Sequence, residues 1–512
     1  MDKKVRVRFA PSPTGGLHLG GVRTVLYNYL FARSHGGDFV LRIEDTDQSR
    51  FVEGAEQYIM DCLKWCGLVP DESPEKGGPF APYRQSERKH LYADYAEQLI
   101  DSGHAYIAFD TTKDLERMRS EHKTEHNTNP QYDYRTRGLM LNSLTLPAEK
   151  VAEMIENGTP HVVRIKMPEN QTITLTDMIR GEITFDSNLV DDKVLLKADG
   201  MPTYHLAVVV DDYLMKITHA FRGEEWLPSA PVHVLLWEYL GWKAHMPLWA
   251  HLPLILKPDG NGKLSKRDGD RLGFPVFAMN WTDPKTGETN KGFREMGFLP
   301  QAFVNMLAML GWNSGTEQEI FSLDELVKAF SIERVHKGGA KFDFEKAKWF
   351  NNQYIHHADN EALATLAKPY IEEGLKKQGL DFGIFDLEFL QKVVGLVKER
   401  CTLLPDFWAQ GHFFFVTPVN IDLAPIKEKW NEQKKDFFAA WVIALEQVAE
   451  WNEQVIEAGF NDLAVAKGLK KGDVMLPLRI MLVGGKYGPG VFTIAEVIGK
   501  KETIKRIKAV DL

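Results

Sequence analysis

A histidine and two glycines lie where a predicted strand gives way to a predicted helix. These residues are His18, Gly20 and Gly21. Apolar and polar side chains alternate in residues 5–9 before them, and apolar side chains recur at helical spacing in residues 22–30 after them. The start of a helix offers N–H groups and a partial positive charge to an anion, and glycines let a ligand approach the backbone closely. The pattern predicts a phosphate-binding turn, although ordinary strand–helix connections are also often rich in glycine.

A second group of candidate residues lies in a basic, glycine-rich segment, residues 257–267. Its candidates are Lys263, Ser265, Lys266 and Arg267. A loop of this composition is typically mobile, and its cations can neutralise the charge that develops on phosphate during nucleotidyl transfer. A basic loop alone is a weak signal. Because this loop follows the histidine–glycine turn in chain order, the two segments together are a stronger signal. They predict one nucleotide pocket that both segments line.

The elements around these segments predict a parallel sheet. Residues 38–45 have the composition of a second strand, which ends at the acidic residue Glu44. A strand–helix–strand unit indicates parallel strands, and ligands bind beyond the carboxyl ends of such strands. We therefore expect Ser12 and Glu44 to lie in the same crevice as His18. The segment 44–47 can also supply an N-cap, through Asp47, for a helix over residues 50–66.

The pattern changes after about residue 83, where helices mix with short strands and indicate an insertion into the sheet domain. A mostly apolar run at 203–212 predicts the strand with which the sheet resumes. Beyond Pro300 the pattern is nearly all helical, and its many aromatic residues fit a core better than a ligand-stacking surface. The fold class is thus multidomain, α/β followed by all-α. The elements expected in the insertion are helices 87–102 and 112–121 and strands 161–167, 172–175 and 183–186.

Composition limits the class of protein. A chain of 512 residues predicts about three to five domains. The formal net charge of −9 excludes a uniformly basic nucleic-acid coat but allows a local basic face, and residues 467–512 are either such a face or a solvated end. Three cysteines indicate a reducing compartment, with Cys62 and Cys66 as packing residues. The absence of a long apolar run predicts a cytoplasmic protein with no membrane partner.

The chain resembles the class I aminoacyl-tRNA synthetases, and among them the bacterial-type glutamyl-tRNA synthetases. Residues 18–21 match the HIGH signature and residues 263–267 the KMSKS signature. Relatives that charge glutamine usually have Pro-Pro-Glu-Pro-Asn where residues 10–14 read Ala-Pro-Ser-Pro-Thr, and this difference favours glutamate. Other matching segments are 8–15, 42–47, 202–207, 221–226, 298–312 and 339–343, with looser matches at 477–479 and 488–489.

The resemblance implies a Rossmann-type parallel-sheet catalytic domain with an inserted acceptor-binding domain, followed by a helical anticodon-binding region. The implied domains are two catalytic halves at 1–82 and 203–257, the insertion at 83–202, the KMSKS loop and stem-contact domain at 258–348, and the helical region at 349–512.

It also implies a two-step reaction. Glutamate and ATP form glutamyl-adenylate and pyrophosphate, and the glutamyl group then passes to the 3′-terminal adenosine of tRNA(Glu). ATP and Mg²⁺ are the implied cofactors, L-glutamate and tRNA(Glu) the partners, and a monomer the expected state. Whether tRNA(Gln) is also charged stays open. The implied catalytic residues are His18, Lys263 and Lys266. The implied ATP-binding residues are His18, Gly20, Gly21, Glu225, Trp226, Lys263, Ser265, Lys266 and Arg267. The implied glutamate-binding residues are Arg8, Ala10, Ser12, Glu44, Tyr204 and Arg222, and Arg400 is an implied anticodon contact.

The chemistry of these residues agrees with a dicarboxylic amino acid. Arg8 and Arg222 offer forked cationic donors to carboxylates, and Glu44 offers a counter-charge to the ammonium group. A cationic pocket discriminates against the neutral amide of glutamine. The alternative for each of these residues is an ordinary ion pair.

Two segments depart from the family pattern. Many bacterial relatives carry a cysteine-based zinc site in the insertion, but residues 105–110 contain no cysteine, so we expect no zinc. His122 and His126 have helical spacing without a clear third ligand, and metal binding there is disfavoured. Residues 273–288 are longer than the usual connection, with hairpin-like turn chemistry at 283–287. They contact tRNA, cover the basic loop or only decorate the surface.

Two other functions were weighed. A truncated relative that glutamylates a modified anticodon base lacks an anticodon domain, whereas roughly 160 mostly helical residues follow Trp349 here. A non-catalytic tRNA-binding paralogue has no need of an intact set of pocket residues.

Overall fold

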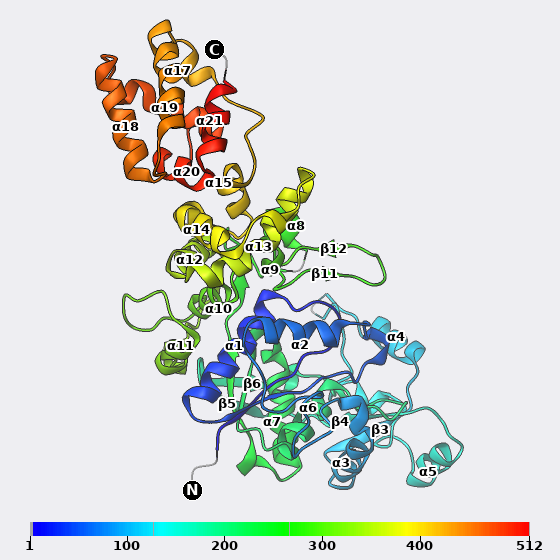
Figure 1. Cartoon of the computed structure of the whole chain (residues 1–512). Coiled ribbons are helices and arrows are strands. Elements are labelled where there is room, and N and C mark those ends of the chain that lie inside the picture. The colour runs from blue at the N-terminus through cyan, green and yellow to red at the C-terminus, as the bar shows by residue number, and fades with distance from the viewer. Residues whose placement is uncertain (1–3, 126, 266, 511–512) are drawn as a thin grey trace. The chain divides into compact units, whose positions relative to one another are not determined.

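The computed structural model describes residues 4–125, 127–265 and 267–510. The chain forms two compact units (Figure 1). The first contains the residues up to Glu295 together with Pro300–Phe344. The second contains Met296–Leu299 and the residues from Glu345 onward.

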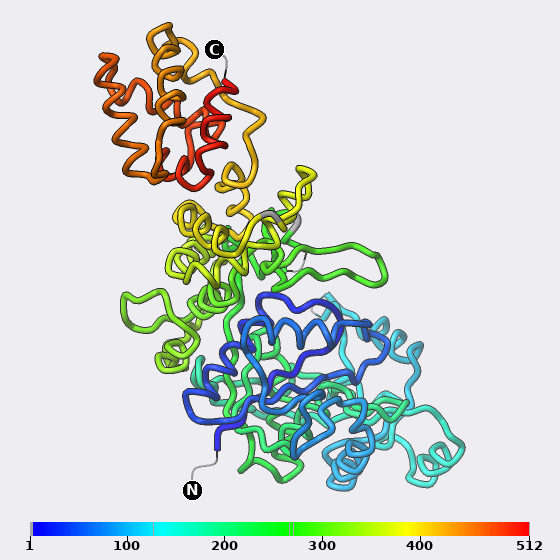
Figure 2. The backbone as a smooth tube through the Cα atoms, in the orientation of Figure 1, coloured from blue at the N-terminus to red at the C-terminus, as the bar shows by residue number. Residues whose placement is uncertain are grey.

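A six-stranded sheet organises the first unit, in the order β2-β1-β8-β9-β5-β6. Its strands are β1 (Arg6–Phe9), β2 (Asp38–Leu41), β5 (Thr172–Asp177), β6 (Gly181–Asp186), β8 (His219–Gly223) and β9 (Leu248–Leu252). Neighbouring strands are parallel except for the β5–β6 hairpin. In β1, Val7 pairs with Phe39 on one side and His219 on the other, so distant parts of the chain lie side by side (Figure 2).

The expected strand–helix–strand unit is confirmed. Helix α1 (Leu19–Ser34) connects β1 to β2 and buries its apolar residues against β1 and β8. The second strand ends at Leu41, earlier than expected, because the next residues bond to another segment: Ile43 N–H donates to Tyr83 O and Gln85 N–H donates to Ile43 O. The turn that carries His18 and the residues after β2 therefore meet at the carboxyl edge of the sheet.

Residues 203–212 do not form the expected strand. They begin helix α6 (Tyr204–Leu214), in which every residue from Leu206 to Asp212 is buried. A helix that is buried all round shows no polar face, so its apolar run cannot be distinguished from a buried strand by periodicity. The helix packs against α3 (Lys89–Asp101), α7 (Ala230–Tyr239) and strand β7 (Val194–Leu196).

The expected insertion divides between two sheets. Strands β3 (Ala105–Ala108), β4 (Val162–Ile165) and β7 form a separate three-stranded sheet, accompanied by α4 (Thr112–Glu121) and α5 (Ala148–Glu156). The β5–β6 hairpin, which we expected in the insertion, belongs to the main sheet through the pairing of Asp177 with Trp249. Alternation of buried and exposed residues identifies β5 as a strand, but it does not determine which of the two sheets the strand joins.

The segment after Glu44 also differs in detail from its prediction. Asp47 caps a single 3₁₀ turn (Gln48–Arg50), and helix α2 (Ala55–Trp65) begins only after Gly54, which has a left-handed φ of 79°. Cys62 and Cys66 are buried, as expected of packing residues. Burial raises the pKa of the Cys62 thiol to about 12.

The rest of the first unit follows β9 along the chain and includes the basic loop. A short hairpin, β11 with β12, forms in the long connection after that loop, as its turn residues predicted. The remaining elements are β10 (Ile255–Leu256), α8 (Asp268–Leu272), β11 (Trp281–Thr282), β12 (Thr289–Asn290), α9 (Phe293–Met296), α10 (Pro300–Met309), α11 (Leu323–Ala329) and β13 (Ala340–Lys341).

The second unit is helical, as predicted. Its core contains edge-to-face aromatic pairs such as Phe437–Phe460 and Trp441–Phe460, so these rings pack inside rather than present a stacking surface. Its helices are α12 (Phe344–His357), α13 (Asn360–Lys377), α14 (Leu387–Val397), α15 (Asp406–Phe415), α16 (Ala424–Lys427), α17 (Glu432–Gln447), α18 (Glu453–Ala466), α19 (Lys471–Val483), α20 (Val491–Ile498) and α21 (Lys500–Lys508).

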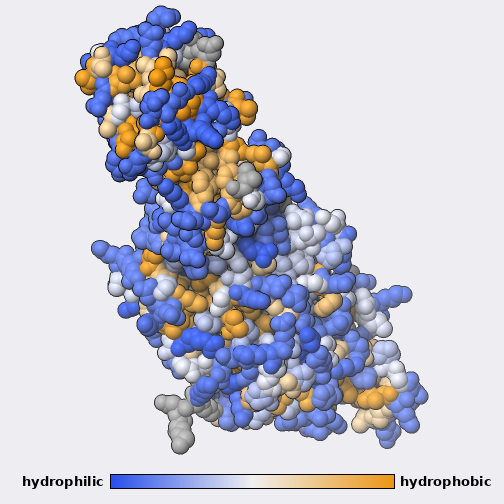
Figure 3. Space-filling model, viewed as in Figure 1, coloured by the Kyte–Doolittle hydropathy of each residue, from blue (hydrophilic) through white to orange (hydrophobic). Residues whose placement is uncertain are grey.

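The face seen in Figure 3 is mainly hydrophilic, with smaller groups of hydrophobic residues between the polar ones. Among the helices of the described residues, none combines the length and apolar character needed to cross a bilayer.

Candidate active site

A cleft of about 930 Å³ lies at the carboxyl edge of the sheet, within the size range of small-molecule sites. It brings together residues that lie far apart in the sequence, from Arg8 in β1 to Ser265 in the basic loop. The expected site residues in its lining are Arg8, Ala10, Ser12, His18, Gly20, Gly21, Glu44, Tyr204, Arg222, Glu225, Trp226, Lys263 and Ser265.

Three expected site residues are not in this group. Lys266 lies outside the described residues. Arg267 is the N-cap residue of α8 and is not part of the lining. Arg400 is exposed in the second unit, in a 3₁₀ turn (Lys398–Arg400).

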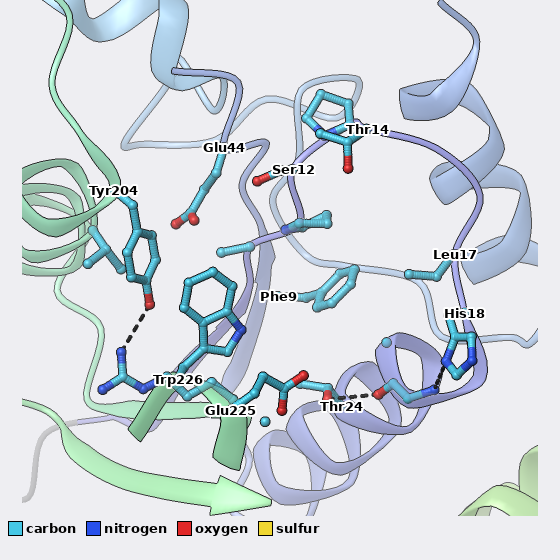
Figure 4. A pocket seen from close by; sticks show the side chains of 18 of the residues that line it. Phe9, Ser12, Thr14, Leu17, His18, Thr24, Glu44, Tyr204, Glu225 and Trp226 are labelled. Atoms are coloured by element: carbon cyan, nitrogen blue, oxygen red, sulfur yellow. Dashed lines mark hydrogen bonds between the residues drawn. The ribbon is translucent and has the colours of Figure 1, made fainter. Parts of the chain in front are cut away.

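The cleft has two chemically different ends. Figure 4 shows Glu44 and Tyr204 on one side and His18 on the opposite side, with Trp226 between them. The side chain of Glu44 points into the cleft, and the hydroxyl group of Tyr204 meets a guanidinium group. One end thus combines carboxylate, phenol and guanidinium groups, and the other is the start of α1.

His18 caps α1 through its own ring. Its Nδ1 accepts a hydrogen bond from Gly20 N–H at 3.1 Å, so the neutral ring carries its hydrogen on Nε2. Leu19 N–H donates to Val276 O at 3.0 Å. Two of the N–H groups expected to await an anion are therefore already bonded within the protein. The Nε2–H group of His18 is a donor of the kind that suits a phosphate oxygen.

The two glycines of this turn serve different purposes. A Cβ atom at Gly21 would lie 2.6 Å from Leu17 Cδ1, so Gly21 makes room for a buried neighbour. A Cβ atom at Gly20 would meet nothing closer than His18 Nδ1 at 3.6 Å. The protein itself does not require glycine at position 20, and the missing side chain there instead leaves space on the cleft side.

Two expected ATP-binding residues pair with each other. Lys263 Nζ lies 2.5 Å from Glu225 Oε1, and both side chains are about half exposed. The loop around Lys263 is held by Asp268, which accepts hydrogen bonds from the Ser265 hydroxyl and N–H groups at 2.6 and 2.9 Å. The Ser265 hydroxyl and Arg271 lower the pKa of Asp268. Our sequence analysis did not identify this aspartate, although its position directly after the signature is a usable signal.

A chain of buried charges forms the other end of the cleft. Arg8 Nε donates to Asp212 at 3.0 Å, Arg42 Nη1 donates to the same carboxylate at 2.8 Å, and Arg42 Nη2 donates to Glu44 at 3.0 Å. Burial alone would raise the pKa of Asp212, but Arg8 and Arg42 outweigh it and lower that pKa. Burial raises the pKa of Glu44 despite the opposing effect of Arg42. Arg8 is thus paired with a protein carboxylate, as in the ion-pair alternative, but the pair is buried and not at the surface.

Arg42 and Asp212 were missed as site residues. Arg42 is fully buried and Asp212 nearly so. The sequence does contain a signal for each: an arginine inside an apolar strand segment, and an acidic residue at the end of an apolar run. Because residues 203–212 were interpreted as a strand, the helical position of Asp212 beneath Arg8 was not foreseen.

Arg222 has a different environment from Arg8. Its Nη1 donates to the Tyr204 hydroxyl oxygen and to His233 Nδ1, both at 3.0 Å, and its Nε donates to His251 Nε2 at 2.8 Å. None of these partners is a carboxylate. Its Nη2 is buried and has no partner among the residues that the structure describes. Arg222 therefore keeps a cationic donor available for an anionic ligand.

The long connection after the basic loop covers the His18 turn. A Cβ atom at Gly16 would lie 2.7 Å from Trp281 Cγ and 2.8 Å from Phe277 Cε1, so both rings press against this glycine. The Tyr58 hydroxyl oxygen accepts from Met279 N–H at 3.2 Å, and its ring packs edge-on to Trp281. The base of this connection therefore packs against the His18 turn, a contact that was not among the three roles considered for it.

His122 and His126 were considered as metal ligands and disfavoured. No group of three or more metal-binding side chains occurs in the part of the chain that the structure describes. His122 is exposed at the end of α4, and His126 lies outside the described residues.

Comparison with known proteins supports the interpretation of this cleft as an active site. The family described as "tRNA synthetases class I (E and Q), catalytic domain" matches residues 4–349, and the family described as "Anticodon binding domain" matches residues 362–510. The glutamate--tRNA ligase of Christiangramia forsetii is 52% identical over 512 residues, which cover 100% of this chain and 99% of the relative. That of Flavobacterium psychrophilum is 53% identical over 509 residues, with 99% of each chain covered.

Solved structures agree as well. The crystal structure of a glutamate tRNA ligase from Elizabethkingia meningosepticum in complex with its amino acid superimposes with a TM-score of 0.93, at 50% identity and with 99% of each chain covered. The glutamate-tRNA synthetase of Elizabethkingia anophelis has a TM-score of 0.91, also at 50% identity and with 99% of each chain covered. The catalytic-domain match covers more than half of the chain, and the similar proteins extend over nearly all of it. This chain therefore belongs to the family of class I tRNA synthetases (E and Q).

Proposed function

We propose that this protein is a glutamate–tRNA ligase that acts in protein synthesis. It activates L-glutamate with ATP to give glutamyl-adenylate and pyrophosphate, and transfers the glutamyl group to the 3′-terminal adenosine of tRNA(Glu). The observation that carries the proposal is the composition of the cleft. At one end, Arg222 provides a buried guanidinium donor whose charge no carboxylate in direct contact compensates. At the other end, the His18 turn provides a helix start that suits a phosphate group.

At the amino-acid end, the Glu44 carboxylate binds the ammonium group of glutamate. Arg222 binds the side-chain carboxylate, with the Tyr204 hydroxyl beside it. Arg8 completes this end while its charge is shared with Asp212, and Ala10 and Ser12 line the wall between the two ends. A neutral glutamine amide would leave the buried Arg222 charge unpaired, which is the basis of discrimination against it.

At the nucleotide end, the carboxylate of glutamate attacks the α-phosphate of ATP and pyrophosphate leaves. His18 Nε2–H, Lys263 and Lys266 stabilise the charge that develops on the phosphate oxygens, and Mg²⁺ accompanies ATP. Gly20 lets ATP approach the backbone. Glu225 holds Lys263 until ATP phosphates compete for its ammonium group. The other proposed ATP-binding residues are Gly21, Trp226, Ser265 and Arg267.

The remaining parts of the chain have proposed roles in binding tRNA. The three-stranded sheet of β3, β4 and β7 and its helices bind the acceptor end, and the helical second unit binds the anticodon, with Arg400 as one contact. The presence of a matched anticodon-binding region disfavours the truncated, base-modifying relative as the function. The protein is proposed to act as a cytoplasmic monomer.

The test is glutamate-dependent exchange between ATP and pyrophosphate, measured with and without tRNA(Glu). We expect exchange with glutamate and little with glutamine. Relatives usually activate glutamate only with tRNA bound, so the reaction with tRNA decides. No exchange under either condition contradicts the proposal. Charging of tRNA(Glu) and tRNA(Gln) in parallel then shows whether the second tRNA is also a substrate.

A further inference from the structure

Arg222 is held by two residues that do not themselves line the cleft. On β8, its Nε donates to Nε2 of His251, which lies on β9. An imidazole nitrogen accepts a hydrogen bond only when it carries no hydrogen, so the hydrogen of the neutral ring is on Nδ1. That Nδ1 lies 2.6 Å from Oδ2 of Asp177, at the end of β5.

Both oxygens of the Asp177 carboxylate accept hydrogen bonds. Its Oδ2 also accepts from His251 N–H at 3.0 Å, and its Oδ1 accepts from the N–H groups of Ile179 and Arg180, each at 2.9 Å. The Asp177 and His251 side chains are completely buried. Burial opposes ionisation of Asp177, but these donors outweigh it and lower its pKa. Burial likewise lowers the pKa of His251, which keeps the ring neutral near pH 7.

We propose that Asp177 and His251 are positioning residues for Arg222 in glutamate recognition. Asp177 fixes the His251 tautomer, and His251 Nε2 then fixes the plane of the guanidinium group so that Nη2 is presented to the side-chain carboxylate of glutamate. This inference rests on the proposed function, because it takes Arg222 as the residue that binds that carboxylate.

The arrangement explains how Arg222 is oriented although no protein carboxylate in direct contact compensates its charge. A carboxylate in direct contact orients Arg8, and it also compensates the charge of Arg8. At Arg222 the carboxylate is one imidazole ring away. The direct contacts of Arg222 are all neutral groups: Tyr204, His233, His251 and the ring of Trp249, whose centroid lies 5.0 Å from the guanidinium carbon.

A second pair of neutral rings supports the same guanidinium. His233 Nδ1 accepts from Arg222 Nη1, so the hydrogen of His233 is on Nε2, which lies 3.3 Å from His205 Nδ1. Burial lowers the pKa of His205 to about 4 and that of His233 below its ordinary range. Both rings stay neutral near pH 7, so neither repels the arginine.

Asp177→Asn is the decisive variant. An amide in place of the carboxylate presents an NH₂ group toward His251 Nδ1, which moves the ring hydrogen to Nε2 and places it against Arg222 Nε–H. We expect the KM for glutamate in tRNA-dependent exchange to rise about tenfold or more, which corresponds to about 1.4 kcal/mol. The KM for ATP is expected to stay within twofold. Asp186→Asn, an exposed position on the same hairpin, is the matched control.

Two substitutions of His251 separate positioning from structural support. A glutamine at 251 can accept through its amide oxygen and donate through its amide nitrogen, so His251→Gln should retain most of the affinity for glutamate. His251→Phe keeps the ring shape but neither function, and should raise the KM for glutamate as Asp177→Asn does. Circular dichroism and thermal unfolding establish folding, and if Asp177→Asn does not fold, the Gln and Phe pair decides.

Unchanged KM values for glutamate in Asp177→Asn and His251→Phe overturn the positioning role. Equal increases in the KM values for glutamate and ATP, or equal losses in the Gln and Phe variants, overturn it as well. A wild-type protein without glutamate-dependent exchange contradicts the proposed function instead, so the two failures are distinguishable.

Discussion

The buried charges Arg8, Asp212, Arg42 and Glu44 show how neighbouring residues divide their roles. The pairs are desolvated, so removing one member leaves its partner charged inside the protein, at a typical cost of about 3–5 kcal/mol. Among the described residues, Arg222 contacts no carboxylate and lacks such an internal partner. If both residues bind the substrate as proposed, loss of Arg8 should affect stability and binding, whereas loss of Arg222 should mainly affect binding.

His18→Asn tests the role of the histidine ring separately from its role as a helix cap. Asparagine caps helices well, so α1 should keep its start, but the Nε2–H donor is lost. We expect kcat for adenylate formation to fall about 10²–10³-fold, as for removal of one donor to a developing charge. The KM for glutamate should change little. The measurement is single-turnover adenylate formation with tRNA bound; a main effect on glutamate KM would contradict this role.

Arg8→Gln should have the opposite profile. The KM for glutamate should increase more than the KM for ATP, because Arg8 lies at the amino-acid end. The free energy of unfolding should also decrease, by about 3 kcal/mol, because Asp212 keeps only Arg42 as a partner. Arg33→Gln, in a partly exposed pair with Asp71, is the control for both measurements. Profiles for His18 and Arg8 variants that look the same would refute the division of roles between the two ends.

At the level of elements, one continuous segment connects the basic loop to the start of α1. Residues 257–265 lead into α8, after which Val276 O accepts the Leu19 N–H and Phe277 forms a bridge with His18. Trp281 then packs over Gly16. The segment that follows the basic loop is therefore in direct contact with the turn that holds His18.

Trp281→Ala should loosen the His18 turn. The indole is nearly buried, so its removal leaves a cavity that costs about 3–5 kcal/mol of folding free energy. We expect kcat for adenylate formation to fall between about tenfold and a hundredfold through misplacement of His18. The KM for glutamate is expected to change little. Lys285→Ala, at the exposed tip of the same connection, should leave kcat unchanged. A higher KM for tRNA in that variant would instead show that the tip contacts tRNA.

At the level of the whole molecule, the two units separate amino-acid chemistry from anticodon recognition. The cleft is made entirely from residues of the first unit, whereas the region matched as anticodon-binding lies in the second. Substitutions in the second unit should therefore act on tRNA binding and not on binding of glutamate or ATP.

Arg400→Ala should raise the KM for tRNA(Glu) about tenfold, near the low end for loss of a base contact. The KM values for glutamate and ATP should stay within twofold at saturating tRNA. Lys376→Ala removes an exposed charge from the same unit and serves as the control. An equal effect of the two substitutions on aminoacylation kinetics would mean that Arg400 acts only through general electrostatic attraction.

Acid should destabilise the first unit through two partly buried histidines. Burial lowers the pKa of His205 and of His219 to about 4 each, whereas an unfolded histidine titrates near 6.5. Between these values the unfolded chain binds protons that the folded chain does not. The free energy of unfolding therefore falls by about 1.4 kcal/mol per pH unit for each residue as the pH decreases.

Denaturant unfolding between about pH 6 and pH 4.5 measures how steeply the free energy of unfolding depends on pH. In the His205→Gln variant this slope should be smaller by about 1.4 kcal/mol per pH unit. His122→Gln, at an exposed position, should leave the slope unchanged. If both variants keep the wild-type slope, His205 titrates normally in the folded protein.

Local patterns in the sequence predicted the elements whose residues are contiguous in the chain. Strand β1, the His18 turn and α1 are contiguous, so period-two and helical spacing and the glycines predict them directly. Resemblance identified Arg8, Glu44, Tyr204 and Arg222, and the structure brings all four into one cleft. The helical second unit followed from its long amphipathic pattern.

Only the tertiary structure decided which charged groups pair. Arg8 meets Asp212 and Arg222 meets His251 because β1, β8, β9 and α6 are brought together by sheet order and helix packing. No local pattern encodes these contacts, since they depend on long-range pairing. The same reason explains α6, whose complete burial removed its periodicity, and the β5–β6 hairpin, whose sheet could not be predicted. The sequence thus predicted most of the residues that line the cleft, whereas packing determined which groups lie behind them and left Arg222, unlike Arg8, without a carboxylate partner among the described residues.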